Sequence, residues 1–161
     1  SKVLALGKSY IVYALTIDAE GTWFCILDEA RSSPMWYPEY CFKIEHQRLS
    51  RYWIINSWKD KQGVNCPILA FPEWANSQYF HCDLVESDEE AWKIFRKYEK
   101  LMNLEFPNST IKETAQIGDD KWLMCPSCID AWEDSDNRNA MVICPICNQM
   151  FHNPRYQPPI A

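Results

Sequence analysis

Four of the eight cysteines have the spacing of metal ligands. They form two Cys-x-x-Cys pairs, Cys125–Cys128 and Cys144–Cys147, with fifteen residues between the pairs. One such turn brings two sulfurs together, and two turns facing each other supply the tetrahedral set of thiolates that Zn²⁺ accepts. The apolar runs before the pairs, 122–124 and 141–143, are expected as short strands that hold the turns. The sequence therefore predicts one Zn²⁺ site with the ligands Cys125, Cys128, Cys144 and Cys147.

Other uses of the four cysteines stay open at this stage. Two disulfides, a redox pair or an iron–sulfur cluster would use the same residue type, and His152 could replace one sulfur. A catalytic zinc ion keeps an open position for water, whereas four cysteines close the coordination shell. We therefore expect a structural ion, in a segment too small to fold without its metal.

The pattern along the chain predicts two folded parts of unequal size. Residues 1–112 are expected to form a β-rich domain and residues 113–120 a linker. Residues 121–153 are expected to form a zinc ribbon, and the proline-containing residues 154–161 an extended or disordered tail. The expected fold class is α+β: an antiparallel β-rich domain with one long amphipathic helix, followed by the small ribbon.

Strands in the larger part are predicted from β-branched and aromatic runs that are separated by turn residues. The predicted strands are 9–16, 22–27, 40–44, 52–58 and 64–71, with a loop at 28–38 and one helical turn at 72–75.

The helix is predicted over residues 88–104. Ser87 and Glu90 have the spacing of a capping box, in which Ser87 caps the helix start. Apolar residues at intervals of three and four are expected to pack on the sheet, and they are Ala91, Ile94, Phe95, Tyr98, Leu101 and Met102. Lys93, Arg96, Lys97 and Lys100 are left for the surface.

Charge and composition argue against several classes of function. The formal net charge is −6, so phosphate backbones are repelled and nucleic-acid binding is not expected. The sequence has no apolar run of about 18 residues, so no transmembrane helix is expected, and residues 1–6 are too quickly polar for a secretory signal. The remaining cysteines lie singly among apolar residues and are expected as buried thiols, which favours a reducing cytoplasm; they are Cys25, Cys41, Cys66 and Cys82.

The sequence contains no recognisable catalytic motif. His46 and His81 are isolated, and Cys82 beside His81 is expected on a strand, where neighbours point to opposite faces. The carboxylate pairs Glu89-Glu90 and Asp119-Asp120 are expected at a helix start and in the linker. We expect a protein that is not an enzyme, with a hydrolase site assembled from distant residues as an alternative.

Negative charge is concentrated in two places. Five of the eight residues from Asp83 to Glu90 are acidic, and four more acidic residues lie between the cysteine pairs, together with Trp132. Both groups could serve solubility alone. The other hypothesis is a docking surface for a basic protein, where complementary charge guides association and aromatic anchors supply affinity. Its candidate contacts are Asp83, Glu86, Asp88, Asp130, Trp132, Glu133, Asp134 and Asp136.

Two resemblances extend these expectations. Residues 121–151, with their paired cysteines, resemble the broad zinc-ribbon class, whose motif is specific for metal and nearly silent about function. The N-terminal two thirds resemble bacterial immunity proteins encoded beside polymorphic toxins of the Rhs and contact-dependent-inhibition systems, although an appended ribbon departs from the simplest members. The segments that prompt this likeness are Gly7–Tyr13, Tyr37–Glu39, Phe42–Ile44, Arg48–Trp53 and Phe71–Trp74.

The second resemblance implies a cytoplasmic, non-enzymatic inhibitor that binds and neutralises one toxin domain, often a basic nuclease. The acidic groups agree with such a partner. A zinc-ribbon module associated with nucleic acid or transcription is the alternative, and it would require a basic stripe, for which only the helix face from Lys93 to Lys100 offers candidates.

Overall fold

The computed structural model describes residues 4–160, and the chain divides into two compact units between Met102 and Asn103. The expectations for residues 1–6 and for the end of the tail fall partly on residues 1–3 and 161, which lie outside the described residues. Within residues 4–160, no helix is long and apolar enough to cross a membrane.

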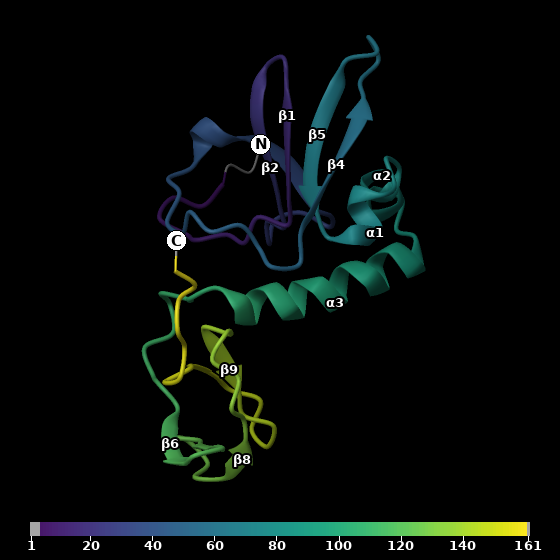
Figure 1. The fold of residues 1–161 in the computed structure, drawn as a ribbon. Coiled ribbons are helices and arrows are strands. Elements are labelled where there is room, and N and C mark those ends of the chain that lie inside the picture. The colour runs from purple at the N-terminus through teal and green to yellow at the C-terminus, as the bar shows by residue number, and fades with distance from the viewer. Residues whose placement is uncertain (1–3, 161) are drawn as a thin grey trace. The chain divides into compact units, whose positions relative to one another are not determined.

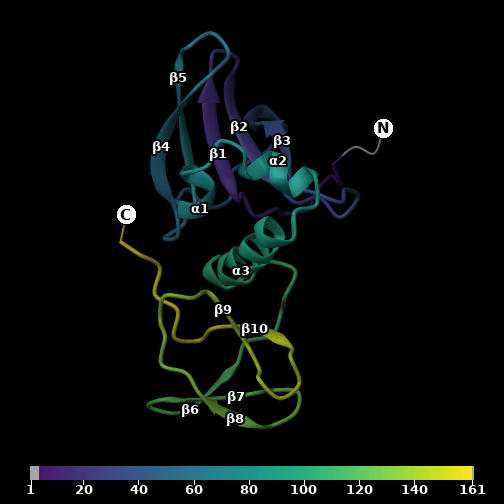
Figure 2. The same cartoon turned by 90° about the vertical axis from the view of Figure 1, so that its right-hand side faces the viewer.

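The first unit is built on an antiparallel sheet with the strand order β3-β2-β1-β5-β4 (Figures 1 and 2). Its strands are β1 (Ala14–Asp18), β2 (Gly21–Ile26), β3 (Met35–Pro38), β4 (Ile54–Lys59) and β5 (Asn65–Ala70). Ala14 is the cross-strand partner of both Cys25 and Ala70, and all three side chains are fully buried. Since side chains alternate between the faces of a sheet, these residues mark the face that carries the core.

Three helices follow the sheet in the sequence: α1 (Pro72–Ala75), α2 (Phe80–Val85) and α3 (Glu89–Glu105). Pro72 opens α1, where its missing N–H costs no helical hydrogen bond. The short helix is fixed against β4 because Asn56 Nδ2 and Trp58 Nε1 both donate to the carbonyl oxygen of Ala75, at 2.9 and 3.0 Å.

Aromatic rings fill the space between the sheet and the helices. The rings of Phe71 and Tyr98 stack at 4.1 Å, and Tyr13 meets Phe95 edge-on at 4.8 Å. Trp74 is fully buried beside them. The predicted apolar face of the long helix therefore packs as core, and the expected fold class, mixed α+β with antiparallel sheets and one long helix, is confirmed.

Several boundaries differ from the sequence-based expectation. The first strand begins at Ala14 and not at residue 9, and the predicted loop 28–38 contains β3. No strand forms at 40–44, so that prediction was wrong: a 3-10 helix covers Glu39–Cys41, and Phe42 then packs its ring near Tyr10, Phe24 and Tyr37.

Helix α2 was not predicted, and it changes the surroundings of two candidate residues. His81 and Cys82 lie on this helix and not on a strand. The expectation of buried thiols was wrong for Cys82 and Cys41, which are exposed, whereas Cys25 is buried. The start of α3 also differs, because the amide of Ala91 donates to Asp88 Oδ1 at 2.8 Å. Asp88 therefore caps the helix, one residue after the predicted Ser87.

The second unit contains two small antiparallel sheets (Figure 2). The first has the order β6-β7-β8 and the second pairs β9 with β10; their bounds are β6 (Gln116–Asp119), β7 (Trp122–Met124), β8 (Ala131–Glu133), β9 (Met141–Ile143) and β10 (Met150–His152). Strand β6 lies inside the expected linker 113–120 and pairs with β7, and Ala115 is buried, so these residues belong to the folded unit.

The described part of the expected tail is also tied to this unit. Arg155 Nη2 donates to the carbonyl oxygen of Asp119, and the amide of Gln157 donates to the carbonyl oxygen of Asn137 at 2.8 Å. The nearby Asn153 side chain donates to the carbonyl oxygens of Asp136 and Asn139, both at 2.8 Å. These bonds fasten the acidic loop between the cysteine pairs.

Candidate metal centre

The two cysteine pairs form turns with the same hydrogen-bond pattern. In the first turn the amide of Cys125 donates to the carbonyl of Asp130, and the amide of Ile129 donates to the carbonyl of Cys125. In the second turn the amide of Cys144 donates to the carbonyl of Gln149, and the amide of Asn148 donates to the carbonyl of Cys144. We call residues 125–130 and 144–149 the first and second knuckle. Their common backbone geometry holds each pair of sulfurs in the same orientation.

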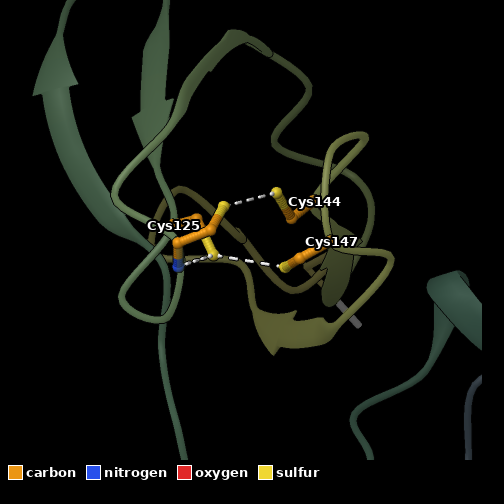
Figure 3. A group of neighbouring side chains, drawn as sticks. Cys125, Cys144 and Cys147 are labelled. Carbon is orange, nitrogen blue, oxygen red and sulfur yellow. Dashed lines mark hydrogen bonds between the residues drawn. The ribbon is translucent and has the colours of Figure 1, made fainter.

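The sulfurs of the two knuckles face each other (Figure 3). Cys125 Sγ lies 3.6 Å from Cys147 Sγ, and Cys128 Sγ lies 3.7 Å from Cys144 Sγ. A tetrahedral zinc ion with bonds of about 2.3 Å places its sulfurs about 3.8 Å apart, which both distances approach. A disulfide needs about 2.05 Å, and all four cysteines are free. The four sulfurs lie within 4.8 Å of one another, so they are positioned to bind one metal ion.

The sulfur cluster forms part of the small core of the second unit. The first cysteine of each knuckle, Cys125 and Cys144, is buried, and the second is half-buried. The apolar cluster around them consists of Ala115, Leu123, Val142 and Phe151, with Trp132 packed against it. An apolar cluster this small stabilises a unit of this size only marginally, and a bound ion would add to its free energy of folding.

Hydrogen bonds give the thiols unequal acidity. Burial opposes ionisation of Cys125, but the amides of Cys128 and Ser127 donate to its sulfur and lower its pKa to about 7. The amide of Asp130 favours the thiolate of Cys128, yet burial and the neighbouring Cys125 and Cys144 outweigh it and raise the Cys128 pKa to about 12. Four thiolates therefore need a cation among them.

The histidines do not contribute to this cluster. His152 Nε2 donates to the carbonyl oxygen of Ile111 at 2.8 Å, so this nitrogen is already engaged, and the metal-binding group of the described residues consists of the four cysteines. In the first unit, His81 Nε2 donates to the carbonyl of Pro34 at 2.9 Å, and its ring stacks on Trp74. In both hydrogen bonds the acceptor is a backbone carbonyl oxygen and not a carboxylate.

The acidic candidates of the ribbon differ in their surroundings. Asp130 and Glu133 are exposed, whereas Asp134 and Asp136 are half-buried. Asp134 Oδ1 accepts from the amide of Asp136, and the Asp136 carboxylate accepts from Arg138. Trp132 is half-buried on β8 and packs against the ribbon core. Asp130 and Glu133 are thus the exposed candidates, and the Asp130 carboxylate also accepts a hydrogen bond from the Cys128 thiol.

The acidic candidates of the first unit are also partly engaged. Asp88 caps α3, Asp83 is half-buried on α2, and Glu86 is exposed at the end of that helix. On α3, Lys93 pairs with Glu90 and Arg96 with Glu99, so acidic neighbours offset part of the positive face. This face is therefore less suited to phosphate groups than its lysines and arginines suggest.

The structure adds two residues that the sequence analysis did not single out. Ile129 is 74% exposed with φ +66°, and Ile146 is 63% exposed. A positive φ costs a residue with a Cβ about 1–2 kcal/mol, and a β-branched side chain is a rarer occupant still. The comparison of the two knuckles could have identified Ile129, because Asn148, a residue that tolerates this conformation, holds the equivalent position.

Comparisons with known proteins give no further assignment: no protein-family model matches the chain, and no match was found among curated proteins or solved structures.

Proposed function

We propose that this chain is a non-enzymatic binding protein whose ribbon, braced by one structural Zn²⁺, presents an acidic surface to a basic protein partner. The observation that supports this most directly is the position of the acidic loop. The acidic loop, residues 130–136, starts at the end of the first knuckle and lies between the two knuckles of a four-sulfur cluster, which has the ligand set of closed structural zinc sites. The ion would therefore fix the shape of the loop and not carry out chemistry.

Zinc is the proposed ion because its chemistry matches the donor set. Zn²⁺ binds four thiolates in tetrahedral geometry, and the cross-knuckle sulfur distances of 3.6 and 3.7 Å suit that arrangement. When bound, the ion neutralises part of the thiolate charge. The four thiolates and the ion together carry a charge of about −2, which adds to the chain's −6. Binding of zinc thus leaves the protein strongly acidic.

The specific form of this proposal is an immunity-type inhibitor that covers the active surface of a basic toxin domain, such as a nuclease. Opposite charges would speed association and fix the orientation of the complex. A standard inhibitory interface buries about 1,600 Å² in total, more than the ribbon loop supplies alone. Further contacts are therefore required, and Asp83, Glu86 and Asp88 of the first unit remain the candidates.

The test uses the zinc-loaded chain and the toxin domain encoded by a neighbouring gene. We expect a dissociation constant below micromolar, inhibition of the toxin, and an association rate that falls with added salt. The double variant Asp130→Asn/Glu133→Gln should associate about tenfold more slowly. The charge-matched control Glu20→Gln/Glu39→Gln changes exposed residues of the first unit and should behave as wild type. Binding no tighter than micromolar, with unchanged toxin activity, would refute the proposal.

A further inference from the structure

Each knuckle places one exposed isoleucine beside a metal-binding cysteine. Ile129 directly follows Cys128, and Ile146 directly precedes Cys147. Both isoleucines therefore neighbour, in the sequence, a ligand of the same four-sulfur cluster. We call these two residues the knuckle patch.

The backbone at Ile129 argues against chance occupation. The fifth residue of both knuckles has a left-handed conformation, with φ +66° at Ile129 and +59° at Asn148. Its amide donates to the first cysteine's carbonyl in both cases, so the turn itself imposes this conformation. Asparagine adopts it readily, whereas a β-branched residue is strained. Ile129 gains no compensating burial, since 74% of it is exposed.

The second knuckle has its exposed isoleucine at a different position. Ile146 corresponds to Ser127 of the first knuckle, and 63% of it is exposed. Neither isoleucine is therefore required by the turn, because each knuckle forms with a polar residue at the position where the other has isoleucine. Backbone strain of the kind seen at Ile129 is found at functional sites, where the surrounding structure maintains it.

We propose that the knuckle patch packs against the apolar face of an amphipathic helix of a partner protein, whose polar face carries lysine or arginine side chains. The charge of the surroundings selects this partner. Asp130 follows Ile129 directly, and residues 103–161 contain eight acidic but only four basic residues. This inference rests on the proposed function, and it adds an apolar anchor to the acidic contact described there.

The test measures binding of a short amphipathic helical peptide of leucine and lysine to the full zinc-loaded chain, with a leucine–glutamate peptide as the probe of opposite charge. We expect the lysine peptide to bind and the glutamate peptide not to bind. Each substitution copies the other knuckle: Ile129→Asn and Ile146→Ser. Together they should weaken binding of the lysine peptide at least tenfold. The control Ile55→Ser, on β4 of the first unit and 71% exposed, should leave it unchanged.

A second readout separates a binding role from a folding role. If Ile129 serves a partner, Ile129→Asn should release zinc to a chelator several-fold more slowly than wild type, because the strain is removed. Faster release would show that the side chain is needed for folding, and would overturn the inference. Unchanged peptide binding in the double isoleucine variant would also overturn it. If Asp130→Asn/Glu133→Gln weakens binding in that case, the acidic docking surface stands without the knuckle patch.

Discussion

The half-buried sulfur of Cys128 lies 3.7 Å from the sulfur of Cys144, in the other knuckle. At the scale of single residues, metal binding by the second unit depends on four cysteine sulfurs, two from each knuckle. Each contributes one thiolate to a closed ligand set, so no member can be lost without opening the site.

Cys128→Ser should abolish stable zinc binding. A serine hydroxyl is a poor replacement for a thiolate, and we expect the apparent zinc affinity to fall by more than about a hundredfold. Cys82→Ser is the matched control, because Cys82 is exposed on α2 and lies outside the cluster. Elemental analysis after dialysis should find one zinc ion per chain in the control and almost none in Cys128→Ser. Equal zinc content in both would contradict the ligand assignment.

The unequal acidity of the thiols makes zinc binding depend on pH. The pKa of Cys125 is about 7, that of Cys128 is about 12, and that of Cys147 is raised above its usual value. Zinc binds thiolates, so at pH 8 each ion displaces at least the protons of Cys128 and Cys147. Protons and metal compete, and the affinity is therefore highest at high pH and falls as the pH falls.

Between pH 8 and 7 the apparent zinc affinity should fall by about a hundredfold or more, because at least two thiols take up protons when the ion leaves. Competition with a chromophoric chelator over this range measures the slope. An affinity that does not change with pH would contradict the coupling of zinc binding to thiol ionisation.

At the scale of elements, the start of α3 distinguishes the sequence-based expectation from the structure. Asp88→Ala removes the side chain that accepts from the Ala91 amide, and should lower the free energy of unfolding by about 1 kcal/mol. Ser87→Ala, the substitution at the predicted cap, should have a smaller effect. Urea denaturation followed by circular dichroism gives both values. A larger loss of unfolding free energy for Ser87→Ala than for Asp88→Ala would instead support Ser87 as the helix cap.

Elements with strong local patterns could be predicted from the sequence. The metal-binding group of four cysteines follows from the Cys-x-x-Cys spacing, and α3 follows from apolar residues at helical intervals over seventeen residues. Helix α2 has six residues, too few to show a helical period. All four residues of β6 are exposed, and its place in the ribbon comes from pairing with β7, which no local pattern records. The conformation of Ile129 likewise follows from turn hydrogen bonds.

At the scale of the whole molecule, each compact unit has a core of a different kind. The core of the first unit consists of rings such as Phe71, Trp74 and Phe95, all fully buried. The core of the second unit includes the buried cysteines 125 and 144. We therefore expect the stability of the second core to depend on a bound metal ion more than that of the first.

Removal of zinc should affect the two units differently. After treatment with EDTA, the ribbon unit should unfold, while the first unit should keep its cooperative thermal transition. Hydrogen exchange resolved along the sequence measures this, with loss of protection in β7 and β9 but not in β1, β2 and β5. Addition of zinc should restore protection. An equal loss of protection in both units, or no loss in the second unit, would contradict the assignment of separate cores.

The proposed role of the acidic loop requires a metal site that is closed and structural. X-ray absorption at the zinc edge, on the purified full-length chain, tests this claim directly. We predict one zinc ion with four sulfur neighbours at about 2.3 Å and no lighter atom in the first coordination shell. Fewer than four sulfurs, with an oxygen or nitrogen neighbour at about 2.0 Å, would indicate an open site and contradict the account.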